Sequence, residues 1–247
     1  MLKKYFKKIF IMIFLIFSVI LTAEDNFMAV GNIKIVRPEP LLIKREDLNI
    51  TIEKDNTIKV ESMYTFSNLG EYNIKSTFMF WLDQTRENDN NNPNNSNKNN
   101  KGKYIKNIKF YSDYKKSENL RAVIKFDENI YENQSVGNIQ REWFAISQTI
   151  PSKETGKLGV YYDLQNTGFN KTKKFVYSFD LVSNFSENNK VEILYVNVYN
   201  KSGRKIDSIV YKDYEFKNLT GKKSQKEHYE LLVANVNLDE KLVINFK

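Results

Sequence analysis

The sequence has 247 residues, a formal net charge of +8 and no cysteine. The absence of cysteine excludes disulfide bonds, thiol catalysis and a lipid attached to an N-terminal cysteine. Four lysines belong to a predicted leader, and the remaining 34 basic and 30 acidic residues are interspersed, so a nucleic-acid partner is not predicted.

The first 23 residues have the layout of a secretory signal peptide. Four lysines precede an almost unbroken apolar run at residues 9–21, and the chain turns polar after Ala23. As a helix this run would span roughly 20 Å, less than the roughly 30 Å hydrocarbon core of a bilayer. The leader predicts cleavage after Ala23 and export to the periplasm or surface of a bacterium. Because Leu21 stands where a small residue is preferred, an uncleaved, membrane-anchored form stays open.

Alternation of apolar and polar residues from residue 48 onward predicts strands with one face in a core and one in water. Leu48, Ile50 and Ile52 precede a hairpin turn expected at residues 53–56. The following strand ends at Asn68 and directs these residues to the core: Ile58, Val60, Tyr64 and Phe66.

A further strand is predicted at residues 74–82, before a low-complexity loop at residues 84–103. That loop has no aliphatic or aromatic residue and cannot contribute to a core. Residues 224–232 are the segment for which a short helix stays an alternative. The other predicted strands cover residues 104–111, 120–126, 142–150, 158–164, 175–182, 191–199, 205–211, 214–216, 229–234 and 241–246.

About a dozen short strands separated by turns predict an all-β fold, an antiparallel β-sandwich built from two packed modules. The expected organisation is a signal peptide at residues 1–23, an N-terminal sandwich at 24–168 and a C-terminal β module at 169–247. The alternative is one large sandwich in which residues 166–173 form an ordinary loop.

The N-terminal part resembles an exported bacterial family of unknown function. Residues 31–33 (GNI) are similar to its Gly-Gly-Leu-like start, and residues 45–50 to its acidic residue before an alternating strand. The family's Tyr-x-Phe-x-Asn strand end resembles residues 64–68. Its aromatic-proline strands, the second followed by a strand ending in tyrosine, resemble residues 78–82 and 143–162. The resemblance covers roughly residues 29–168 and implies an exported β protein with no assigned activity.

No catalytic, cofactor-binding or metal-binding residue is predicted, and no cofactor. His228, the only histidine, lies in a lysine-rich segment typical of a solvated surface, so neither a zinc site nor a Ser-His-Asp triad is expected. Glu87 and Asp89 belong to the Asn-rich loop, which has too little charge for a calcium site. Asp127 and Glu128 are adjacent on a strand end, and we expect their side chains to point apart, unlike a glycosidase pair.

Aromatic residues allow two interpretations. Trp81 and Trp143 could form a platform for a sugar or peptide, but packing in or over the core is favoured. The same holds for the tyrosines at 161–162 and 195–199. Lysines at 171–174 and 222–223 are interpreted as solvated turns that protect sheet edges from aggregation.

These patterns predict a non-enzymatic, exported protein of the cell envelope that binds a partner or has a structural role. The expected partner is an envelope protein or a glycan, bound through loops or an exposed strand edge. Contact with a membrane is expected only through an uncleaved leader, and the sequence does not define an oligomeric state. Two alternatives stay open: a surface adhesin, and a hydrolase of envelope glycans with two carboxyl groups roughly 5–9 Å apart.

Overall fold

The computed structural model describes residues 29–31, 34–35, 40–85, 105–112, 115–117, 127–129, 139–165, 173–179, 190–221 and 226–247. These residues form strands and their connections, which confirms the predicted all-β sandwich. Within these ranges there is no helix long and apolar enough to cross a membrane. The predicted leader, the predicted strand at 120–126 and most of the Asn-rich loop lie outside the described residues.

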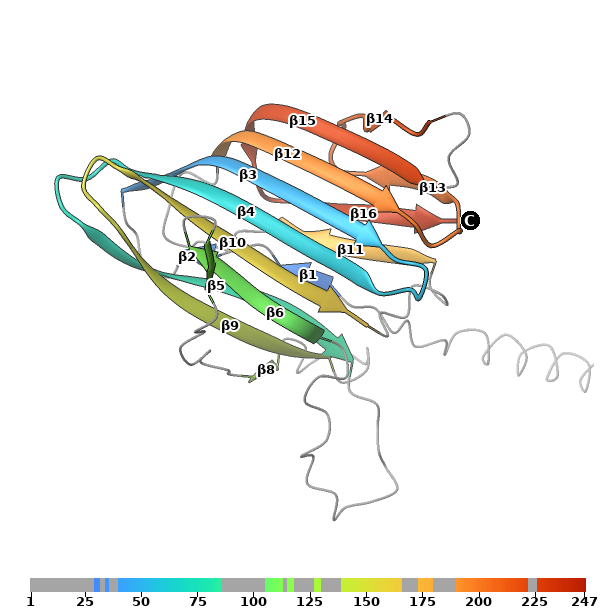
Figure 1. Ribbon diagram of the computed structural model, residues 1–247, viewed down its shortest axis with the longest axis horizontal. Helices are drawn as coiled ribbons and strands as arrows, with labels where there is room; N and C mark the ends of the chain where they lie inside the picture. The colour runs from blue at the N-terminus through green and yellow to red at the C-terminus, as the bar shows by residue number, and fades with distance from the viewer. Residues whose placement is uncertain are drawn as a thin grey trace, which may run out of the picture.

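The strands form two sheets that pack face to face (Figure 1). Sheet A contains, in spatial order, β13 (Ile206–Val210), β16 (Lys241–Phe246), β11 (Lys174–Ser178), β1 (Ala29–Gly31), β5 (Ile74–Thr85), β9 (Ile139–Ile150) and β8 (Asp127–Asn129), and β2 (Lys34–Ile35) also pairs with β5. Sheet B contains β14 (Lys217–Asn218), β15 (Glu227–Asn237), β12 (Lys190–Asn200), β3 (Leu41–Ile52), β4 (Ile58–Asn68), β10 (Thr155–Leu164), β6 (Ile105–Ser112) and β7 (Lys115–Ser117).

The prediction of two separate modules is wrong for the described strands, because strands from both sides of residues 166–173 alternate within each sheet. In sheet B, β12 pairs with β3 in parallel, and in sheet A, β11 pairs with β1 in parallel. The other ladders of the two sheets are antiparallel. The single large sandwich, which was the alternative interpretation, therefore describes this fold.

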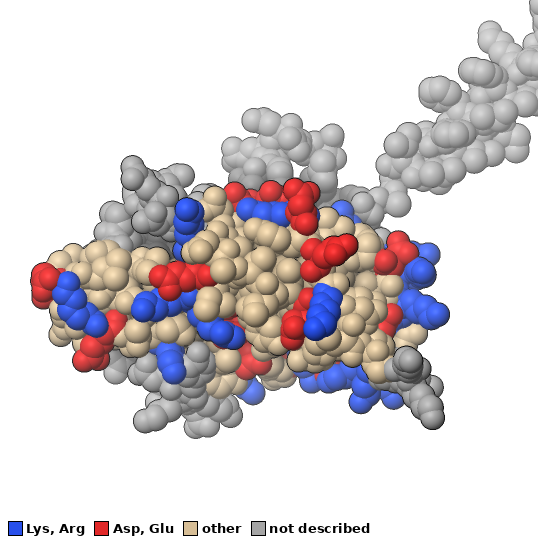
Figure 2. Space-filling model, turned by 90° about the horizontal axis from the view of Figure 1, so that it is seen from above, with Lys and Arg blue, Asp and Glu red and all other residues tan. Residues whose placement is uncertain are grey.

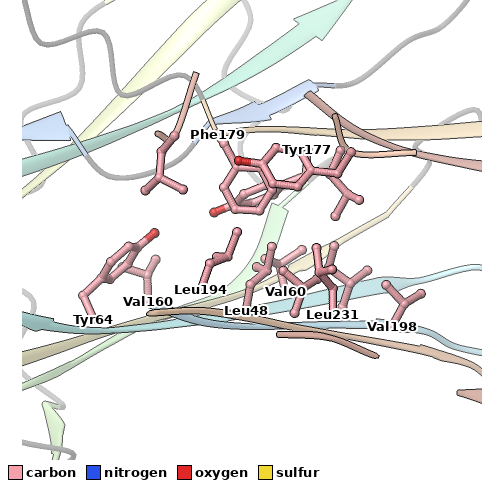
Figure 3. Close-up of a cluster of buried hydrophobic side chains, with 14 of the residues drawn as sticks. Leu48, Val60, Tyr64, Val160, Tyr177, Phe179, Leu194, Val198 and Leu231 are labelled. Atoms are coloured by element: carbon pink, nitrogen blue, oxygen red, sulfur yellow. The ribbon is translucent and has the colours of Figure 1, made fainter. Parts of the chain in front are cut away.

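Alternation along the strands produces the core between the sheets, as predicted. Leu48, Ile50 and Ile52 of β3 have no exposed surface, and neither do Ile58 and Val60 of β4. Figure 3 shows side chains of sheet B facing those of sheet A; the residues labelled there are Leu48, Val60, Tyr64, Val160, Leu194, Val198 and Leu231 on one side and Tyr177 and Phe179 on the other.

A polar cluster lies inside this apolar core. Glu46 is completely buried, and its Oε1 accepts a hydrogen bond from the Ser62 hydroxyl at 3.0 Å. The register of β3 and β4 places Glu46 opposite Tyr64. Burial is the largest cause that raises the pKa of both Tyr162 and Tyr177 well above the ordinary value. Electrostatic interactions with neighbouring groups, including Glu46, raise it further. A carboxyl group inside an apolar core needs hydrogen-bond donors such as the Ser62 hydroxyl, because an uncompensated buried charge costs several kcal/mol.

The chain crosses twice between the sheets at the left end of Figure 1, and Asn68 is hydrogen-bonded to both crossings. The chain passes from β4 to β5 through residues 69–73 and from β9 to β10 through residues 151–154. The Asn68 Nδ2 atom lies within 3.0 Å of the carbonyl oxygens of Tyr72, Ile150 and Pro151, and its Oδ1 accepts from the Gly70 amide. One buried amide thus connects both crossings.

We expect Asn68→Ala to lower the free energy of unfolding by about 2 kcal/mol, because it leaves several buried backbone groups without their hydrogen-bond partner. Urea denaturation followed by circular dichroism measures this loss. The matched control is Asn73→Ala in the same crossing, since Asn73 is exposed and accepts a single hydrogen bond from the Ser152 amide. Equal losses in the two variants would contradict the connecting role of Asn68.

Several boundaries differ from the sequence predictions, and three of the differences have a clear structural reason. Residues 226–232, for which a helix was the alternative, belong to a turn and to strand β15, whose ladder with β12 fixes an extended backbone. Residues 214–216 are not a strand, and β14 follows them instead. Strand β5 continues to Thr85, two residues into the predicted loop, because it stays paired with β9.

Candidate functional site

A polar pocket of about 560 Å³ is bordered by the β3–β4 hairpin at one end of sheet B. This hairpin lies at the right end of Figure 1. We call this cavity the hairpin-end pocket. Its lining combines carboxylates, lysines and neutral polar side chains: Glu53, Lys54, Asp55, Thr57, Lys59, Asp163, Gln165, Lys201 and Lys226. Strand pairing explains this composition, since Lys59 of β4 is opposite Asp163 of β10, and Lys201 directly follows the end of β12.

The hairpin turn that borders the pocket is fixed by its own hydrogen bonds. The Glu53 amide donates to the Thr57 carbonyl at 2.8 Å, and the Asn56 amide donates to the Glu53 carbonyl at 3.1 Å. Asn56 has a φ of 66°, in the left-handed region that asparagine tolerates better than most residues. The predicted turn at 53–56 is therefore confirmed, and it presents Lys54 and Asp55 at fixed positions.

Glu53 connects two lysines on one wall of the pocket. Its Oε1 is 3.2 Å from the Lys201 Nζ and 3.3 Å from the Lys59 Nζ. Burial by itself would raise the pKa of Glu53, but the interactions with Lys201 and Lys59 together outweigh it and leave the pKa below its ordinary value. Glu53 is accordingly an ionised group that neutralises part of the lysine charge.

The other two carboxylates also have partners within the fold. The two oxygens of Asp163 accept from the Tyr161 hydroxyl and the Asn107 Nδ2 atom, both at 2.6 Å. Asp55 Oδ1 accepts from the Thr57 amide at 3.0 Å, and this backbone hydrogen bond lowers the pKa of Asp55. Burial, with the Asp163 hydrogen bond second, raises the pKa of Tyr161, so the hydroxyl stays a donor at neutral pH.

A ladder of polar and aromatic side chains continues from the pocket across the outer face of sheet B. Asn197 Nδ2 donates to Asn49 Oδ1 at 3.1 Å, and Asn197 Oδ1 lies 3.0 Å from the Nε2 of His228. The His228 ring stacks on Tyr199, with centroids 4.4 Å apart. The Tyr195 hydroxyl donates to Glu230 at 2.6 Å, which raises the pKa of Tyr195.

His228 is therefore not the solvated surface residue that the sequence indicated. It lies partly buried on β15, where its ring nitrogen contacts an asparagine and its ring contacts a tyrosine. Neither partner is a carboxylate, so this arrangement is not that of a Ser-His-Asp triad. Among the described residues, no group of three or more His, Asp or Glu residues could hold a metal ion.

The other residues considered in the sequence analysis lie at separate places in the fold. Trp81 and Trp143 are directly opposite each other in β5 and β9, and Asp127 and Glu128 are consecutive in β8. Tyr162 is buried in the core, whereas Tyr161 faces outward. Lys173 and Lys174 are exposed before and at the start of β11. Glu87, Asp89, Lys171 and the lysines at 222–223 lie outside the described residues.

Sequence reasoning missed the hairpin-end pocket. Glu53 and Asp55 were assigned to a turn, and Lys201 lies between the predicted strands at 191–199 and 205–211, without any sign that these two segments meet. Glu53 and Lys201 are 148 positions apart, and they approach each other because β12 pairs with β3. Charges over the face drawn in Figure 2 are of both signs and interspersed, in agreement with the sequence, so that face carries no large field of one sign.

No family model and no curated protein matches the chain. Among solved structures, a putative nutrient binding protein from Legionella pneumophila has a TM-score of 0.60 and 10% sequence identity, over 89% of this chain and 70% of that chain. At this identity, the similarity establishes a shared fold.

Two other similar structures belong to enzymes. They are a putative protease from Parabacteroides distasonis, with a TM-score of 0.46 and 6% identity, and an M1 zinc metallopeptidase from Deinococcus radiodurans, with a TM-score of 0.43 and 10% identity. The alignments cover 84% and 83% of this chain. They cover 40% and 42% of the two enzyme chains, so this protein spans less than half of their lengths.

Proposed function

We propose that this chain is an exported, non-enzymatic binding protein of the bacterial cell envelope, and that its hairpin-end pocket holds a small polar ligand. The pocket itself carries the proposal. Its volume of about 560 Å³ lies within the roughly 300–1,000 Å³ typical of small-molecule sites. No aliphatic or aromatic residue lines it, and its charged and amide side chains can hydrogen-bond to a polar ligand.

The electrostatics of the pocket favour binding over glycan hydrolysis. A glycosidase needs one carboxyl group that stays protonated near neutral pH to act as the general acid. The pKa of Glu53 is lowered by two lysines, and that of Asp55 by a backbone amide. Both oxygens of Asp163 already accept hydrogen bonds within the fold, from the Tyr161 hydroxyl and from Asn107 Nδ2, each at 2.6 Å. Glu53 and Asp55 thus lack the environment of a general acid.

Export and family membership complete the proposal. The predicted leader supports passage through the inner membrane, and the motifs at residues 45–50 and 64–68 support a divergent member of the exported family of unknown function. Both motifs have a structural role in this fold, since each contains a buried polar residue, Glu46 in the first and Asn68 in the second. A ligand-binding role agrees with the name of the Legionella protein, with which this chain shares its fold.

The binding test is a nuclear magnetic resonance titration of the 15N-labelled protein lacking residues 1–23. The probes are inorganic phosphate, citrate, glucose and putrescine. We expect at least one probe to shift the amide resonances of residues 53–59, 163–165 and 201 in a saturable manner, while the probe itself stays chemically unchanged. Conversion of a probe, or the absence of saturable shifts for all four, would contradict a binding function of this pocket.

Export is tested separately by mass spectrometry of the N-terminus and protease accessibility on intact cells. We expect a mature protein that starts at Glu24. An unprocessed protein recovered from the cytoplasm would contradict export. Protease cleavage on intact cells would favour a surface location, and protection until the envelope is opened would favour the periplasm.

A further inference from the structure

In the hairpin-end pocket, the carboxylates, which accept hydrogen bonds, have more partners within the fold than the lysines, which donate them. All three carboxylates already accept hydrogen bonds or ion pairs from the protein: Glu53 from two lysines, Asp55 from the Thr57 amide, and Asp163 from Tyr161 and Asn107. Each carboxylate therefore already has at least one partner within the fold, and Asp163 has one on each of its oxygens.

The donors have capacity left. An ammonium group carries three N–H donors, and the pocket uses one of them at Lys59 and one at Lys201, both toward the same Glu53 oxygen. Lys54 makes no ion pair within the described part of the chain and is exposed at the tip of the turn. Lys226 adds a fourth lysine to the lining, so lysines outnumber carboxylates four to three.

We infer that the hairpin-end pocket selects an anionic small molecule, one that carries a carboxylate or a phosphate group. This inference rests on the proposed function and adds the chemical class of the ligand. Lys54, Lys59 and Lys201 would contact the anion, while Glu53 holds Lys59 and Lys201 close together despite their like charges. Hydrogen bonds between ammonium and anionic oxygens are roughly twice as strong as neutral ones, which gives this class its advantage.

The experiment compares binding of the four probes, phosphate, citrate, glucose and putrescine, in the parent protein and in three variants. Lys54→Gln and Lys201→Gln each remove one ammonium group from the pocket. Lys190→Gln is the matched control, because Lys190 is an exposed lysine at the opposite end of the same strand, β12. Circular dichroism of each variant verifies that the fold is retained.

We expect phosphate or citrate to bind, with the dissociation constant raised about tenfold by Lys54→Gln and by Lys201→Gln and unchanged by Lys190→Gln. Raising the ionic strength should weaken binding further. Saturable binding of glucose or putrescine alone would overturn the anionic class but leave the binding function standing. Absence of binding by every probe would overturn both, and an equal effect of Lys190→Gln would show that net charge, rather than this pocket, attracts the anion.

Discussion

Replacing Glu46 with alanine should lower the free energy of unfolding by about 4 kcal/mol. The substitution removes a completely buried carboxyl group, leaves the Ser62 hydroxyl without its acceptor and creates a cavity between the sheets. Truncation of a large buried side chain costs roughly 2–5 kcal/mol, and leaving a buried polar group without its hydrogen-bond partner costs about 1–3 kcal/mol. Urea denaturation followed by circular dichroism measures the loss.

Two further variants separate the causes. Glu46→Gln keeps the side-chain volume and one oxygen acceptor, so we expect a loss of only about 1 kcal/mol. Glu61→Ala, on the neighbouring strand β4 but on the outer face, should change stability by less than about 0.5 kcal/mol. If Glu46→Ala were as mild as Glu61→Ala, the polar cluster would not stabilise the core.

Alkaline pH should unfold the protein steeply. Burial is the largest cause that raises the pKa of Tyr162, Tyr177 and Tyr211 above the ordinary value near 10. Above pH 10 these tyrosines lose their protons when the chain unfolds but retain them in the folded state. Their contribution to stability is therefore complete below pH 10 and lost as the pH rises, by about 1.4 kcal/mol per pH unit for each tyrosine and about 4 kcal/mol per unit for three.

Urea midpoints measured between pH 9 and pH 11.5 give this slope, and variants assign it. Tyr177→Phe should reduce the slope by about 1.4 kcal/mol per pH unit, because one buried phenol is removed. Tyr72→Phe is the control, since Tyr72 is 57% exposed and its replacement should leave the slope unchanged. A slope that is the same in all three proteins would show that groups other than Tyr177 govern alkaline unfolding.

The fold could be predicted from sequence wherever the signal is local. The period-two pattern around Ile58, Val60 and Phe66 located β4 and its buried face correctly. The same pattern extends backward from Leu48 to Glu46, so the inward direction of Glu46 was already present in the sequence. A carboxylate normally indicates the solvent-facing side of a strand. Nothing in the local sequence indicates that Glu46 is surrounded by a buried serine, which donates a hydrogen bond to it, and by buried tyrosines.

Assignment of two modules failed for a different reason. Pairing between β3 and β12, or between β1 and β11, leaves no mark in either strand, because a buried central strand has the same composition whichever neighbour it has. The hairpin-end pocket depends on that pairing, since Glu53 and Lys201 come together only when β12 lies beside β3. The local sequence likewise indicates a surface position for His228. Only the pairing of β12 with β15 brings its ring against Tyr199.

The parallel pairing of β3 with β12 has a consequence for the order of folding. Asn49 and Asn197, whose side chains are hydrogen-bonded in the completed sheet, are 148 positions apart. A nascent chain that ends before β12 leaves one edge of β3 open, and such an edge can recruit another chain. Contacts this distant in sequence also raise the contact order and slow folding. Truncated forms that lack residues after 189 should therefore aggregate rather than persist as a smaller domain.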